Sequence, residues 1–129
     1  MTGKEIYDLA LLLIGCKNSD GSDNADCDDF LSRSCGIINI LLAENLRLDR
    51  ALKGQPDAAA ESISSLSVPV GCHPLLARAV LPYALASLLV ADEDAELSRK
   101  LQESCLLNKS QLLASVKGLR HEIEDCYPA

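Results

Sequence analysis

Aromatic residues are scarce in this sequence, which has three Tyr, one Phe and no Trp among its 129 residues. A core with so few rings must be filled by aliphatic side chains, and hydrophobic residues make up 48% of the chain. Leu and Ala dominate them and favour helices, whereas β-branched residues are few. The composition therefore excludes a disordered chain and argues against an all-β fold.

Positive charge is also in short supply. The chain has 12 Lys and Arg against 19 Asp and Glu, a net charge of −7, and no Lys- or Arg-rich stretch offsets this locally. Because an acidic surface is repelled by phosphate backbones, we expect no direct nucleic-acid binding.

Long hydrophobic runs of the kind that enter membranes are missing too. The first apolar run, residues 9–14, follows acidic rather than basic residues, so no secretory signal is predicted. The longest nearly uncharged stretch, residues 75–91, contains Arg78 and Pro82 and, at 17 residues, sits at the lower limit for a membrane span. We therefore expect no membrane association and interpret this stretch as a buried core helix.

The sequence contains none of the common catalytic or nucleotide-binding motifs, such as a phosphate-binding glycine loop or a zinc-protease helix. The acidic residues 16–29 fail the calcium-loop pattern, because placing Gly21 at the sixth position puts Cys27 where a bidentate Glu is needed. We therefore expect no catalytic, cofactor-binding or metal-binding residues, no cofactor and no enzymatic activity.

Six scattered cysteines form no CxxC pair, which predicts reduced thiols that fill small apolar spaces. Cys72 and His73 are adjacent, but nothing at metal-ligand spacing accompanies them. A small thiol enzyme is the alternative, using Cys72, Cys105 or Cys126 with His73 or His121.

Apolar spacing predicts an all-α fold: a single-domain bundle of five or six helices over residues 1–129, with a buried central helix around residues 75–91. Thr2 and Glu5 fit a capping box at the start of the first helix. A second helix is expected over about residues 28–52, and its internal Gly36 indicates a close approach by another helix.

The remaining segments are predicted in shorter pieces. A short helix is expected over residues 57–62, followed by irregular chain with an extended piece at residues 68–70. Pro82 should kink or restart the central helix. Two separate helices should then follow, capped by Asp92 and by Ser110.

Three stretches, residues 28–52, 61–105 and 123–128, carry a family resemblance when taken in order. They contain Leu-Pro-Tyr-x-Leu-Ala at residues 81–86, an acidic turn at residues 92–96, an amphipathic helix and an acidic-aromatic chain end. This pattern resembles small helical head–tail connector, or head-completion, proteins encoded among the head genes of tailed phages and prophages of Gram-positive bacteria. The tail of that family usually carries glycines after its Tyr, whereas Pro128 and Ala129 follow Tyr127 here.

The resemblance implies a virion-assembly structural protein that binds portal and tail or adaptor proteins and joins a homo-oligomeric ring between them. It also implies residence in the bacterial host cytoplasm during assembly and then in the virion. An alternative from a different class is a cytosolic helical adaptor or regulator that binds one protein partner through an acidic face.

Contact residues for such partners would be apolar side chains left over from the core, and Leu106, Leu107 and Val70 are the candidates. A second candidate is the basic end of the second helix, where the sequence places Arg47, Arg50 and Lys53. Because the net charge of −7 opposes self-association, we expect a monomer or small oligomer in dilute solution, with larger assemblies at high salt or with a portal partner.

Overall fold

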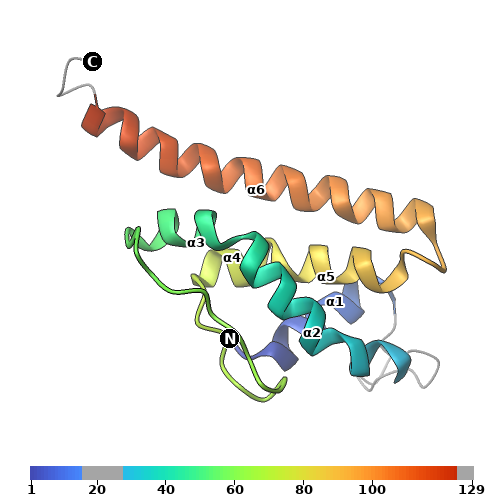
Figure 1. The fold of residues 1–129 in the computed structure, drawn as a ribbon. Coiled ribbons are helices and arrows are strands. Elements are labelled where there is room, and N and C mark those ends of the chain that lie inside the picture. Colours follow the sequence, from blue (N-terminus) through green and yellow to red (C-terminus); the bar gives the residue numbers. More distant parts are fainter. Residues whose placement is uncertain (16–27, 125–129) are drawn as a thin grey trace.

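The structure, a computed structural model, describes residues 1–15 and 28–124; for residue 28 and residues 117–124 the description covers the backbone only. Within these ranges the protein is an all-α bundle, as expected, and one isolated antiparallel bridge between Thr2 and Pro69 is the only β pairing (Figure 1). The helices are α1 (Gly3–Leu13), α2 (Asp28–Glu44), α3 (Leu46–Lys53), α4 (Pro74–Ala79), α5 (Leu81–Val90) and α6 (Ala95–Glu124).

Helix α5 occupies the centre of the bundle and packs against α1, α2, α4 and α6. Its side chains are buried almost all round, with Leu81, Leu85 and Leu89 the largest of them. The helix contacts other elements on most of its sides, which is why its sequence is apolar on nearly every face, and Leu88 is its exposed exception. The predicted buried central helix is confirmed.

The stretch expected as one helix over residues 75–91 is divided at Val80 into α4 and α5. Pro82 occupies one of the first two positions of α5, where its missing N–H would have had no intrahelical partner in any case. The expected restart at this proline is therefore confirmed. Asn108 of α6 covers the break, since its Nδ2 donates to the Ala79 carbonyl at the end of α4 over 2.7 Å.

Helix α1 begins as predicted. The Thr2 hydroxyl accepts from the Glu5 N–H over 3.2 Å, and the Glu5 carboxylate accepts from the Thr2 N–H over 3.2 Å. Gly3 is buried where an added Cβ would come within 2.8 Å of the Ile63 Cδ1. The connection between α3 and α4, which contains Ile63, therefore lies directly on the start of α1. The N–H of Lys4 also donates to the Leu66 carbonyl over 2.7 Å.

Two expectations for residues 28–52 are wrong. The segment is two helices rather than one, because Asn45 leaves helical geometry and its Nδ2 donates back to the Leu41 carbonyl over 2.8 Å. Gly36 does not mark a close helix contact, since it is exposed and an added Cβ would meet nothing within 4 Å. Gly54 ends α3 in a left-handed conformation, with φ of 67°.

The connection from α3 to α4 contains no helix, so the short helix expected over residues 57–62 is wrong. Side chains of the bundle hold this connection instead. Asn39 donates to the Ile63 carbonyl over 2.9 Å and accepts from the Ile63 N–H over 2.8 Å. Arg50 donates to the Ala58 carbonyl over 2.7 Å. These bonds satisfy the backbone locally, which removes the need for helical hydrogen bonds.

The C-terminal region is one helix of 30 residues, not two. Ser110 starts no new helix, because good helix formers surround it and no Pro or Gly interrupts residues 95–117. The cap is Asp94 rather than Asp92: the Asp94 carboxylate accepts from the Leu97 N–H over 3.0 Å. The acidic residues 16–27, the chain end 125–129 and the side chains of Leu119 and Ile123 lie outside the description.

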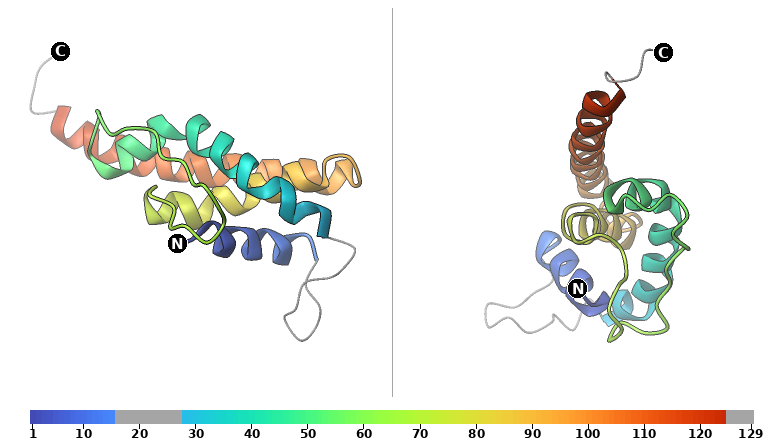
Figure 2. Two further views of the ribbon diagram at one scale, coloured as in Figure 1. Left: turned by 60° about the horizontal axis from the view of Figure 1, so that its bottom comes forward. Right: turned by 90° about the vertical axis from the view of Figure 1, so that its left-hand side faces the viewer.

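Helix α6 lies along one side of the bundle, above α5 in its first half and above α3 and α4 in its second half (Figure 1). In both views of Figure 2 its C-terminal end extends past the other helices. The first half of α6 therefore belongs to the core, and the second half forms one wall of a groove.

Candidate docking groove

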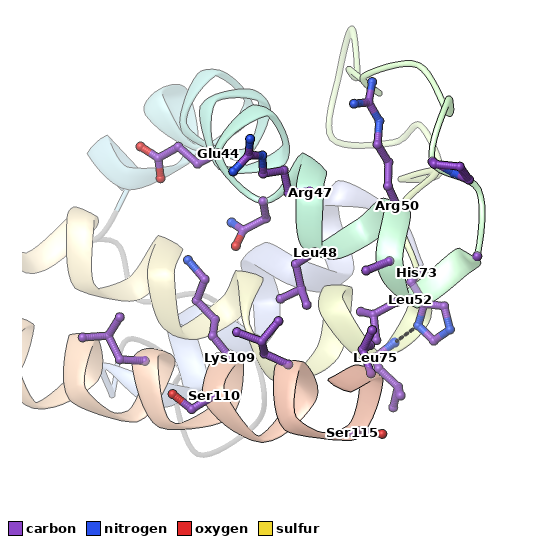
Figure 3. A pocket seen from close by; sticks show the side chains of 17 residues that line it. Glu44, Arg47, Leu48, Arg50, Leu52, His73, Leu75, Lys109, Ser110 and Ser115 are labelled. Atoms are coloured by element: carbon purple, nitrogen blue, oxygen red, sulfur yellow. Dashed lines mark hydrogen bonds between the residues drawn. The ribbon is translucent and has the colours of Figure 1, made fainter. Parts of the chain in front are cut away.

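A groove of about 1090 Å³ runs between α3 and α4 on one side and the second half of α6 on the other (Figure 3). Its α6 wall is formed by side chains that recur three or four positions apart and so share one helical face. These are Leu106, Lys109, Ser110, Leu113 and Val116, and Ser115 lines the groove beside them. The groove lies where α6 continues past the N-terminal end of α5 and runs beside α3 and α4.

The groove is apolar along its length. Leu75 from α4, Leu106 and Leu113 from α6 line it, and all three are exposed to solvent. Leu48 and Leu52 of α3 line it as well and are half-buried. Single exposed leucines are ordinary on protein surfaces, but a group converging on one groove is typical of binding sites.

Cations outnumber carboxylates in this groove, although the chain as a whole is acidic. Its lining includes Arg47, Arg50 and Lys109 against one carboxylate, that of Glu44. In Figure 3 Lys109 extends from α6 towards α2 and α3, whereas Arg50 turns away towards the connection that it binds. Neither Arg47 nor Lys109 forms an ion pair with any residue that the structure describes, so both cations are open to an external partner.

Asn45 lines the groove too, and only 2% of it is exposed. Its Nδ2 binds the Leu41 carbonyl, but its Oδ1 has no hydrogen-bond partner within the described residues. A buried acceptor without a donor costs free energy, which makes this oxygen a position where an N–H or O–H would be favourable.

The α3–α4 wall is fixed by the buried carboxylate of Asp49. One of its oxygens accepts from the His73 N–H over 2.6 Å, and the other lies 3.1 Å from the Lys53 Nζ. Lys53 also donates to the Gly71 carbonyl over 2.6 Å. His73 in turn caps α4, its Nδ1 accepting from the Leu75 N–H over 3.1 Å. Asp49 thus joins α3 to the segment that starts α4.

Two of the three thiols named as candidate nucleophiles, Cys72 and Cys105, lie in surroundings that do not activate them. Burial raises the pKa of Cys72 from 9.0 to about 11; the Asp49 carboxylate adds to this shift and Lys53 opposes it. Burial also raises the pKa of Cys105, whose thiol donates to the Val80 carbonyl over 3.8 Å. Because the thiolate is the reactive form, neither residue is activated as a nucleophile. Cys126 and His121 fall outside the described side chains.

The described residues contain neither a cluster of metal ligands nor a membrane-spanning helix. In this part of the chain no three His, Cys, Asp or Glu side chains gather closely enough to hold a metal ion. Among the described helices, none combines the length and the apolar character needed to cross a membrane.

The sequence predicted part of this site. Leu106 lines the groove and is exposed, and Leu107 is exposed beside it but outside the lining. The prediction for Val70 is wrong because it is buried under the start of α1. Of the basic residues at the end of α3, Lys53 is held by Asp49 and Arg50 by the connection, which leaves Arg47.

Sequence reasoning missed Leu75, Lys109 and Leu113, which complete the groove. A period-3.6 pattern over residues 106–116 would have grouped Lys109 with the two leucines had α6 been recognised as one helix. Nothing in the sequence brings Leu75 to them, since it arrives from another element.

The chain was compared with protein-family models, curated proteins and solved structures, and none of the three comparisons gives a match.

Proposed function

We propose that this chain is a virion-assembly structural protein of the head–tail connector type, which works by binding portal and tail components through its surface. The observation that carries the proposal is the second half of α6, where Leu106, Leu107 and Leu113 are exposed. The resemblance of residues 28–52, 61–105 and 123–128 to phage connector proteins supplies the class of partner.

Exposed leucines on a continuing helix are what such a role requires. The helix is anchored in the core by its first half, so the second half is presented on a rigid support at little entropic cost. Interface cores are enriched in large apolar side chains that lose contact with water on binding. Ring formation around a portal would bury further surface of each copy, and the proposed places of action are the host cytoplasm and the virion.

We expect a portal gene in the same genome, and co-purification with that portal protein tests the proposal. We expect the tagged portal to retain this chain and to retain much less of the Leu106→Asp, Leu107→Asp double variant. Leu88→Asp is the matched control, because Leu88 is exposed but lies on α5, outside the groove lining. A portal that retains neither the wild-type chain nor any variant would contradict the connector function.

The second candidate is a helical adaptor that binds one partner through an acidic face. The specific observation for it is the α5–α6 turn, where Asp92, Glu93 and Asp94 are all exposed. Replacing Asp92 and Glu93 by Lys would abolish partner binding under this candidate and would leave portal binding unchanged under the first.

A further inference from the structure

We infer that the groove between α3, α4 and α6 binds an amphipathic helix of a partner protein, with leucine-like side chains facing inward and carboxylates along its edges. The inference rests on the proposed function for one point, that this chain acts by binding a protein. It adds the location of the contact and the chemistry of the partner segment.

The shape of the groove favours a helix. Its walls are themselves helices, and the face of α6 that looks into it repeats every three to four residues from Leu106 to Val116. A third helix can pack its own side-chain ridges against such a face, with apolar anchors at positions i, i+3 or i+4, and i+7. At about 1090 Å³ the groove holds several large side chains rather than one.

The cations of the groove favour a partner segment that carries carboxylates. Lys109 stands on the α6 wall and Arg47 on the α3 wall, and neither has an ion-pair partner within the described chain. The chain as a whole carries a net charge of −7, so these two cations stand against an acidic background. An acidic partner segment would therefore be repelled elsewhere and attracted here, which gives the contact its position.

Two synthetic peptides of about 16 residues, long enough for roughly four helical turns, provide the probe. Both carry leucines on one face; one has Glu on the flanks of that face and the other has Lys. We expect the Glu peptide to bind the intact chain at least about tenfold more tightly than the Lys peptide, measured by fluorescence anisotropy. Equal affinity for the two, or no binding of either, would overturn the inference.

Charge reversal locates the binding site. Arg47→Glu with Lys109→Glu should weaken binding of the Glu peptide by at least about tenfold and improve binding of the Lys peptide. Arg99→Glu with Lys100→Glu makes the same charge change on α6 outside the groove lining and should leave both affinities as they were. An equal loss in this control would overturn the assignment to the groove.

A leucine pair gives the same comparison for the apolar face. Leu113 and Leu88 are both 43% exposed, but only Leu113 lines the groove. Leu113→Asp should abolish binding of the Glu peptide and Leu88→Asp should not. Circular dichroism of each variant confirms that the helices are retained, and the exposed charge variants serve where a leucine variant fails to fold.

These results separate the inference from the proposed function. Binding of the Glu peptide in the groove without portal binding would keep the inference and remove the connector function. Portal binding that survives Arg47→Glu with Lys109→Glu would keep the connector function and remove the inference.

Discussion

The two halves of α6 differ in what they bury, although they belong to one uninterrupted helix. Residues 95–105 pack on α5: Leu101 and Cys105 are in the core, and the Ser98 hydroxyl donates to the Ser87 carbonyl over 2.8 Å. Residues 106–116 are anchored by Asn108 but leave three leucines exposed. The same helix thus provides stability at one end and an unpartnered apolar face at the other.

This comparison separates folding from function within one element. Apolar residues in the first half are explained by the core that they complete. The three exposed leucines of the second half add no comparable stability to the isolated protein, because their surfaces stay in water. The proposed contact with another molecule would account for them, and the predictions below test that difference in order of expected effect.

The largest effect should come from truncating matched leucines in the two halves. Leu101 is 6% exposed and Leu107 is 59% exposed. Leu101→Ala should lower the free energy of unfolding by about 2–5 kcal/mol, because it leaves a cavity in the core. Leu107→Ala should change it by less than about 0.5 kcal/mol. Urea unfolding measures both, and similar losses would show that α6 is not divided in this way.

The next effect is the pH dependence of the free energy of unfolding that Cys72, just before α4, should cause. The folded protein holds the Cys72 proton more tightly than the unfolded chain does, since its pKa is raised from 9.0 to about 11. The bound proton therefore adds about 2–3 kcal/mol to the free energy of unfolding. This contribution is fully present below pH 9 and is lost as the pH rises through 11.

The matched measurement compares urea unfolding of wild type and Cys72→Ala at pH 8 and at pH 10.5. Other groups titrate in this range in both proteins, so the difference between them isolates Cys72. We expect the wild type to lose more stability than the variant between the two pH values. Parallel losses would contradict a protonated, buried thiol at this position.

Sequence patterns predicted the first half of α6 better than the second, for a physical reason. Leu97, Leu101 and Cys105 recur every four residues and so share one apolar face, a pattern that can be read from a single helix. The same logic identified the capping box of α1 and the apolar α5. Each of these features is determined by residues within about two turns of one another.

Features that depend on partners distant in sequence were not predictable. Asn45 ends α2 because its side-chain amide binds the Leu41 carbonyl, and an asparagine at this position does not by itself predict that bond. Asp49 is buried because Lys53 and the His73 N–H compensate its charge. The groove itself is formed mainly by α3, α4 and α6, which are separated in sequence. Among its lining residues, Leu106, Arg47 and Arg50 were the contact candidates named from the sequence.

Loss of the Asp49 carboxylate tests the rigidity of the groove wall. Asp49→Ala removes the acceptor of the His73 N–H and the partner of Lys53, which retains some access to water. We expect a loss of about 1–2 kcal/mol in the free energy of unfolding. Lys53→Ala should cost less, because the His73 N–H keeps its acceptor. If both variants unfold like the wild type, the wall does not depend on this carboxylate.

The smallest effect should be a gain, on the face of α2 that lies outside both regions. Gly36 is exposed within a helix and has open space where a Cβ would lie. Gly36→Ala should therefore raise the free energy of unfolding by about 0.5–1 kcal/mol. Thermal unfolding would reveal this gain, and a lower midpoint would indicate a contact at this glycine after all.

Amide hydrogen exchange along α6, in the free chain and with its cognate portal protein, tests the central claim most directly. In the free chain we expect slow exchange over residues 95–105 and faster exchange over residues 106–116, because the first half is part of the core. Adding the portal should slow exchange in the second half and in the groove wall opposite it. Uniform protection along the free helix, or a portal-induced change confined to residues 95–105, would contradict the division of α6 into a stabilising half and a binding half.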